Sequence, residues 1–210
     1  MQQNYLREIA RRDNKVVRAS DFRAKAAGTQ LRRLAAAGAL LRLAHGYYAL
    51  VPEASRGRGT KWIPSIEAAA LGVAAADYGV DQVALLGPSA ARLHGCYPRA
   101  LGTAVVAVPS QRPEKETVAG SIKFVVRDTS ALDVVRASTE LVTGRMTSVE
   151  QTLLDLSDDW PRWPVTESAR LEMMQLLGRR ASVDVLQEVA AATRGGASLQ
   201  RVRRIVDDLG

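Results

Sequence analysis

Two short apolar runs stand close together in the first quarter of the chain, at residues 40–43 and 47–51. The three residues between them end in Gly46, and a glycine between two such runs is typical of a β-hairpin. Immediately before the hairpin, Gly38 follows a helical pattern, and glycine suits the left-handed position after the last turn of a helix. We therefore expect a helix that ends at Ala37 and leads directly into a two-stranded hairpin.

Further helical patterns precede this helix and hairpin. Residues 3–12 alternate apolar and charged side chains at helical spacing. Ser20 can cap a short helix that begins at Asp21, and Thr29 can cap the longer helix after a tight turn at residues 26–28. Helix, short helix, turn, helix and hairpin within about 50 residues is the order of a winged helix-turn-helix. The sequence therefore predicts such a domain at this end of the chain.

Positive charge is concentrated in the same part of the sequence. Of the 29 Lys and Arg residues, 24 are Arg, a bias that a GC-rich genome produces without any functional cause. The distribution carries more information. Residues 1–62 hold 13 basic and four acidic residues, a net +9, whereas residues 63–210 hold 16 basic and 18 acidic residues, a net −2. Such an asymmetry points to a polyanionic partner for the first segment.

The helix before the hairpin has an outer face suited to DNA. At about 100° per residue, Leu31 and Leu34 fall on one side of this helix. Arg33 falls on the opposite side, with Arg32 and Gln30 beside it. An ordinary solvated helix can present the same face, but the hairpin and the basic segment together favour DNA. Because arginine can read guanine and glutamine can read adenine, we predict that Gln30, Arg32 and Arg33 contact base edges.

Other side chains are placed to contact the DNA backbone. Residues 52–61 are polar, with two glycines and no periodicity, which indicates a linker or a long extension of the hairpin. Basic residues in such a segment can enter a minor groove, or simply lie in a solvated tether. For His45, an ordinary turn residue is the commoner alternative. We predict contacts to phosphate or the minor groove from Thr29, Arg42, His45, Arg56 and Arg58.

The rest of the chain reads as a second domain. The patterns predict helices at 65–78, 148–156, 166–177, 183–192 and 198–209, strands at 83–86, 103–108 and 122–126, a polar loop at 110–120, and a short helix capped by Ser89. We therefore expect an α+β chain. Its winged helix-turn-helix domain is expected at residues 1–55, a linker at 56–62, and a mixed α/β domain with a helical C-terminus at 63–210.

The sequence offers few residues for catalysis. It has two histidines and a single cysteine, Cys96, so neither an internal disulfide nor a thiolate metal site is expected. Ser89 follows Gly-Pro rather than lying in a G-x-S-x-G motif, which favours a helix cap over a nucleophile. His94 lacks partners at metal-ligand spacing, and the three aspartates within residues 155–159 are expected on a solvated helix end. We expect no catalytic residue, no metal and no cofactor.

Two further features bear on location and contacts. The longest apolar stretch, residues 66–76, is interrupted by Glu67 and is too short to span a bilayer. The N-terminus has charges where a signal peptide needs apolar residues, so a cytoplasmic protein without membrane contact is expected. Trp160 and Trp163 lie in a proline-bounded loop, where exposed rings would be interface anchors. Packing over helix ends is the favoured alternative for them.

Three segments of the chain resemble a known family. The sequences LRRL at 31–34 and LAHGYYAL at 43–50 resemble the winged-helix and wing signature of the AbiEi antitoxins of type IV toxin–antitoxin systems. The sequence LGPSAARLHG at 86–95 resembles the S-A-x-x-x-x-G element of that family, and TSVEQTLLDL at 147–156 its T-S-x-x-x-T-L-x-D-L helix. The three segments follow one another in the order in which the family has them.

The resemblance implies a bacterial, cytoplasmic antitoxin encoded beside a nucleotidyltransferase-like toxin. Such antitoxins bind double-stranded operator repeats upstream of their own operon and separately counteract the toxin. The two roles would divide at the charge boundary, with DNA at residues 1–62 and neutralisation from residue 63 onward. Self-association on the DNA repeats, as dimers or as cooperating monomers, is compatible with this function.

Two other functions remain open from the sequence. One is a free-standing winged-helix transcriptional regulator whose second domain senses a small ligand, and a neighbouring toxin gene would count against it. The other is an interaction module whose winged helix binds protein instead of DNA.

Overall fold

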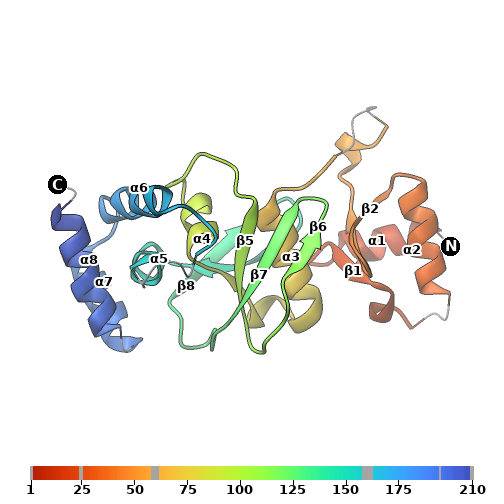
Figure 1. Ribbon diagram of the computed structural model, residues 1–210. Coiled ribbons are helices and arrows are strands. Elements are labelled where there is room, and N and C mark those ends of the chain that lie inside the picture. Colours follow the sequence, from red (N-terminus) through yellow and green to blue (C-terminus); the bar gives the residue numbers. More distant parts are fainter. Residues whose placement is uncertain (1, 24–25, 58–61, 158–162, 194, 209–210) are drawn as a thin grey trace.

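The computed structural model describes residues 2–23, 26–57, 62–157, 163–193 and 195–208, and it has mixed α+β architecture (Figure 1). Residues 2–57, the winged region, have the helix, strand and hairpin order of a winged helix-turn-helix. Its elements are α1 (Gln2–Ala10), β1 (Val16–Arg18), the 3-10 turn η1 (Ala19–Asp21), α2 (Ala27–Ala36), β2 (Leu40–Ala44) and β3 (Tyr47–Leu50). The predicted hairpin and the helices on either side of residues 13–26 are confirmed, whereas β1 was not expected.

The short helix predicted from Asp21 is wrong. Residues Ala19–Asp21 form one 3-10 turn, and Ser20 lies inside it instead of capping a helix. The backbone N–H of Arg18 donates to Asp21 Oδ2 at 2.8 Å, which closes the turn. Phe22 is then extended, with φ −121° and ψ 136°, so the helical path ends there.

The start of α2 also differs from the expectation. The helix begins at Ala27, with Ala26 at the N-cap position and no side-chain cap hydrogen bond. Thr29 is therefore an early residue within the helix, and its predicted capping role is wrong. Its Oγ1 instead accepts a hydrogen bond from Arg32 Nη2 at 3.2 Å.

The small sheet of this region is buried on both faces. Its strands pair antiparallel in the order β1-β3-β2, with Val17 opposite Tyr48 and Leu41 opposite Ala49. Because side chains alternate along a strand, one set of side chains faces α1 and α2. The other set faces the second region, which is the part of the chain from residue 62 onward. The first set is Val17, Leu40, Tyr48 and Leu50, which pack with Ile9, Leu31 and Leu34; the second is Val16, Leu41, Leu43, Tyr47, Ala49 and Val51.

The second region is built on a six-stranded mixed sheet in the order β6-β7-β5-β4-β9-β8. β5 pairs antiparallel with β4 and parallel with β7, and β4 pairs parallel with β9. The strands are β4 (Ala84–Leu85), β5 (Thr103–Val108), β6 (Lys115–Thr117), β7 (Gly120–Val126), β8 (Val134–Ser138) and β9 (Thr143–Thr147). β6 lies inside the segment predicted as a polar loop, and β8 and β9 were not predicted, because none of the three alternates apolar and polar residues.

Helices pack against this sheet and form the C-terminal end of the molecule (Figure 1). They are α3 (Ile66–Tyr78), α4 (Pro88–Leu93), α5 (Val149–Leu156), α6 (Glu167–Gly178), α7 (Val183–Ala192) and α8 (Gly196–Asp208), with 3-10 turns at η2 (Glu53–Ser55) and η3 (Val80–Gln82). Helices were predicted at all of these α-helical positions. Ser65, Ser148 and Thr166 cap α3, α5 and α6 through their hydroxyl oxygens. None of the helices in the described ranges is long and apolar enough to cross a membrane.

The larger of two apolar clusters extends from the second face of the small sheet through the second region, and the smaller one joins the first face of that sheet to α1 and α2. α3 is buried along most of its length between the large sheet and the winged region, and its apolar residues pack with the second face of the small sheet. The division of the chain at residues 56–62 stays a prediction.

Two expectations for the C-terminal part have clear outcomes. Trp163 is 2% exposed and packs against Gly87, so its buried interpretation is confirmed. Trp160 lies outside the described residues. Asp155 is buried rather than solvated, and Arg127 Nη2 lies 3.8 Å from its Oδ1. The expectation of a solvated helix end is therefore wrong for Asp155, while Asp158 and Asp159 lie outside the described residues.

Candidate nucleic-acid interface

The outer face of α2 presents donors around small residues. Leu31 and Leu34 are buried beneath the helix, whereas Thr29, Arg32 and Arg33 are exposed on it. The helix ends with small, exposed alanines, which allow a close approach to this face. A convex helix face with arginines and small residues can enter a major groove and donate to base edges.

The arginines of this face have no acidic partner in the described part of the chain. Two acidic residues of the same region pair with other arginines: Glu8 Oε1 lies 2.6 Å from Arg12 Nη2, and Asp21 Oδ1 lies 3.2 Å from Arg18 Nη2. The charges of Arg32 and Arg33 are therefore left to solvent or to a polyanion.

Gln30 is placed less favourably for reading a base. Its side chain is half-buried, and its Oε1 is buried without a hydrogen-bond partner among the residues that the structure describes. Bidentate recognition of adenine needs both the amide oxygen and the amide nitrogen. The side chain must therefore rotate outward before it can make the predicted contact.

The hairpin brings a second cationic group to the helical side of the small sheet. Arg42 is exposed and lies on the same face of β2 as Leu40, which packs under α1 and α2. Its Nη2 is 3.1 Å from His45 Nδ1, and His45 is exposed in the turn. The structure thus brings Arg42 together with His45, and Thr29 together with Arg32.

The basic arm predicted at Arg56 and Arg58 is not a free, solvated segment at Arg56. Arg56 is half-buried, its Nε donates to the carbonyl oxygen of Val51 at 3.0 Å, and its Nη1 lies 4.0 Å from Glu53 Oε1. Arg56 must leave these partners before it can enter a groove. Arg58 lies outside the described residues.

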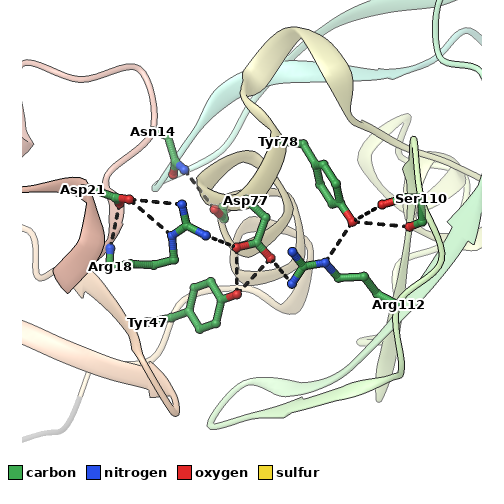
Figure 2. A network of polar contacts seen from close by, with 9 residues as sticks. Asn14, Arg18, Asp21, Tyr47, Asp77, Tyr78, Ser110 and Arg112 are labelled. Atoms are coloured by element: carbon green, nitrogen blue, oxygen red, sulfur yellow. Dashed lines mark hydrogen bonds and ion pairs between the residues drawn. The ribbon is translucent and has the colours of Figure 1, made fainter.

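Residues beneath the hairpin form a network that the sequence did not indicate (Figure 2). The side chain of Asp77, at the end of α3, is 1% exposed and accepts from Arg18 Nη1 at 2.6 Å, Arg112 Nη1 at 2.7 Å and the Tyr47 hydroxyl at 2.8 Å. Burial, followed by the hydrogen bond to Asp77, raises the pKa of Tyr47 to about 12. Arg112 in turn donates through Nε to the Tyr78 hydroxyl at 2.8 Å.

This network joins residues that are far apart in the chain. Asp77 and Arg112 belong to the second region, and Arg18 and Tyr47 to the winged region. In the sequence, this network is indicated only by an aspartate near the end of an apolar helix. That position does not predict which residues pair with Asp77.

The residues considered for catalysis are buried or hydrogen-bonded to the backbone. Ser89 is buried in α4, and its Oγ accepts from the backbone N–H of Val105 at 2.8 Å, so its predicted role as a helix cap is wrong. His94 Nε2 lies 2.8 Å from the carbonyl oxygen of Thr147. Cys96 is buried, and burial raises the pKa of its thiol. Within the described ranges, no three His, Cys, Asp or Glu side chains are grouped to hold a metal ion.

One comparison with known proteins gives a match. Residues 4–51 match the family described as "Transcriptional regulator, AbiEi antitoxin", which spans α1 to the end of β3. The AbiEi resemblance is thereby confirmed for the winged region, which carries Arg32 and Arg33. No curated protein matches the chain.

Proposed function

From the antitoxin-regulator domain at residues 4–51, we propose that this protein is a DNA-binding antitoxin of a type IV toxin–antitoxin system. The winged region would bind double-stranded operator DNA upstream of its own operon and repress it. The rest of the chain would counteract a nucleotidyltransferase-like toxin. Both roles would be performed by binding, without catalysis, metal or cofactor, and two copies could associate on operator repeats.

The observation that carries the DNA-binding role is the exposed pair Arg32 and Arg33. Neither has an acidic partner among the described residues, and both stand on the helix that follows the turn of the motif. In such domains this helix enters the major groove. Thr29, Arg42 and His45 would then contact phosphates, and Gln30 would reach a base after rotation.

The DNA-binding role is tested by fluorescence anisotropy with a labelled duplex from the region upstream of the gene. If about five phosphates are neutralised, the logarithm of the binding constant should fall with the logarithm of salt concentration at a slope of about −4 to −5. Arg32→Ala with Arg33→Ala should abolish specific binding. Arg203→Ala with Arg204→Ala is the matched control, because it removes an exposed arginine pair from α8 at the other end of the molecule. A slope near zero would contradict the DNA-binding role.

The antitoxin role is tested by co-expression with the product of the adjacent gene and scoring of growth. The full-length chain should restore growth, and the Arg32→Ala, Arg33→Ala variant should restore it equally. The full-length chain is needed, because removal of residues 1–62 would uncover α3 and take Arg18 and Tyr47 away from Asp77. Loss of rescue in a folded arginine variant would contradict separate sites for the two roles.

A cleft in the second region favours a second function, that of a ligand-sensing regulator. The cleft has a volume of about 590 Å³ and lies between the loop after β7 and the helices α5, α7 and α8. Its described lining includes Arg127, Gln151 and Asp155. Failure to restore growth, together with retained operator binding, would favour this function over the antitoxin role.

A further inference from the structure

The carboxylate of Asp77 connects the second region to the turn that precedes α2 (Figure 2). Arg18 Nη1 lies 2.6 Å from Asp77 Oδ1. The same guanidinium donates through Nε and Nη2 to Asp21 Oδ1, at 3.2 Å in each case. Arg18 thus bridges a buried carboxylate of α3 and a carboxylate of η1.

The turn η1 is in direct contact with the start of α2. A Cβ placed on Gly28, in the first turn of α2, would lie 3.6 Å from the Cβ of Ala19 in η1. The exposed face of α2 begins one residue later, at Thr29. A shift of η1 would therefore be transmitted to the helix that carries Arg32 and Arg33.

The other partners of Asp77 hold it in place independently of Arg18. Arg112 Nη1 lies 2.7 Å from Oδ2, and the Tyr47 hydroxyl lies 2.8 Å from both carboxylate oxygens. Arg112 comes from the segment between β5 and β6. The second region therefore fixes this carboxylate through α3, which carries Asp77, and through the segment that carries Arg112. The carboxylate can therefore serve as a fixed anchor for Arg18.

We propose that Asp77 is a positioning residue for operator binding, which holds η1 and α2 through Arg18 and Asp21. The inference rests on the proposed DNA-binding function and extends it. The region after residue 62 would contribute to operator affinity without touching DNA. Any partner of that region that disturbs Asp77 would then also change operator affinity, because coupling between two sites is reciprocal.

The test uses substitutions for which charge and position predict opposite signs. Asp77→Asn and Asp21→Asn each remove one negative charge from the protein. Electrostatics alone would therefore make both variants bind DNA more tightly. Loss of positioning makes them bind more weakly, and we expect about a tenfold loss of operator affinity, within the usual range of coupling between sites.

Glu67→Gln is the matched control. Glu67 is a second buried carboxylate of α3, 0% exposed, and it pairs with Arg92 Nη1 at 2.9 Å. It lies in the first turn of the helix, whereas Asp77 lies in the last. Its substitution makes the same change of charge and also breaks a buried ion pair, yet it should leave operator affinity at the wild-type value. An equal loss in Glu67→Gln and Asp77→Asn would overturn the inference, because general destabilisation would then explain both.

A second measurement does not depend on DNA. Amide hydrogen exchange of the free full-length protein should show faster exchange in α2 for Asp77→Asn and Asp21→Asn, with α6 unchanged. If Asp77→Asn does not fold, Asp21→Asn carries the test, because its side chain is partly exposed. Unchanged exchange in α2 overturns the inference, whether or not the protein binds DNA. Absence of duplex binding by the wild-type chain overturns the proposed function, and the role of Asp77 in operator binding falls with it.

Discussion

Val16 of β1 packs so closely on Gly72 of α3 that a Cβ on Gly72 would lie 2.4 Å from Val16 Cγ2. The carbonyl oxygen of the same glycine accepts a hydrogen bond from Asn14 Nδ2 at 2.9 Å. Side chains of the winged region therefore lie directly on the backbone of α3 at this point. The two parts of the chain share a packed interface that has no room for an added methyl group.

Gly72→Ala should destabilise the protein. In a solvated helix this change is stabilising by about 1 kcal/mol. At Gly72, overpacking against Val16 should instead lower the free energy of unfolding by about 1–3 kcal/mol. Urea unfolding of the full-length chain measures the change.

Gly28→Ala is the control for Gly72→Ala, because Gly28 is also helical but its added Cβ would meet only ordinary contact at 3.6 Å. This variant should be stabilised by about 0.5–1 kcal/mol. Stabilisation of both variants would show that the contact between Val16 and Gly72 is not tight in solution.

Ser89→Ala should reduce stability and leave function unchanged. The Val105 N–H would lose its acceptor in a buried site, which costs about 1–3 kcal/mol. Ser182→Ala is the control, since Ser182 stands at the start of α7 without a side-chain cap hydrogen bond. Thermal unfolding measures the first effect, and growth rescue the second. Loss of rescue at a temperature where Ser89→Ala is folded would indicate a functional hydroxyl.

Local patterns were enough to predict the hairpin and the α-helices that the structure describes, although the short helix predicted from Asp21 was wrong. The range 183–192 was predicted to be helical and is α7, with Leu186, Val189 and Ala190 buried in the core. The exposure of Arg32 and Arg33 likewise follows from helical periodicity alone. These features depend on residues within a few positions of one another, so the sequence carries them directly.

The features that were missed depend on distant partners. β9 contains Gly144 and Arg145 and becomes a strand by pairing with β8 and β4. Asp77 and Arg18 are 59 positions apart, and no pattern indicates their contact. The burial of β3 on both faces did have a signal, since an unbroken apolar run is typical of a strand that is covered on both sides.

Ionisation of the Tyr47 hydroxyl should make the protein less stable as the pH rises from 10 to 12. Its pKa is raised from 10.0 to about 12 in the folded protein, first by burial and then by its hydrogen bond to Asp77. The unfolded chain therefore loses this proton at a lower pH than the folded chain does. The stabilisation is fully present below pH 10 and is lost as the pH rises through 12, by about 2–3 kcal/mol in total.

Tyr47→Phe isolates this contribution, because every other ionisable group is present in both proteins. The variant keeps the ring and removes the ionisable hydroxyl that donates to Asp77 at 2.8 Å. Below pH 10 it should be less stable than the wild type, since a buried carboxylate loses a donor. Between pH 10 and 11.5 its free energy of unfolding in urea should fall less steeply, so that the two curves converge. Parallel curves over this range would mean that the Tyr47 hydroxyl is not buried against Asp77 in solution.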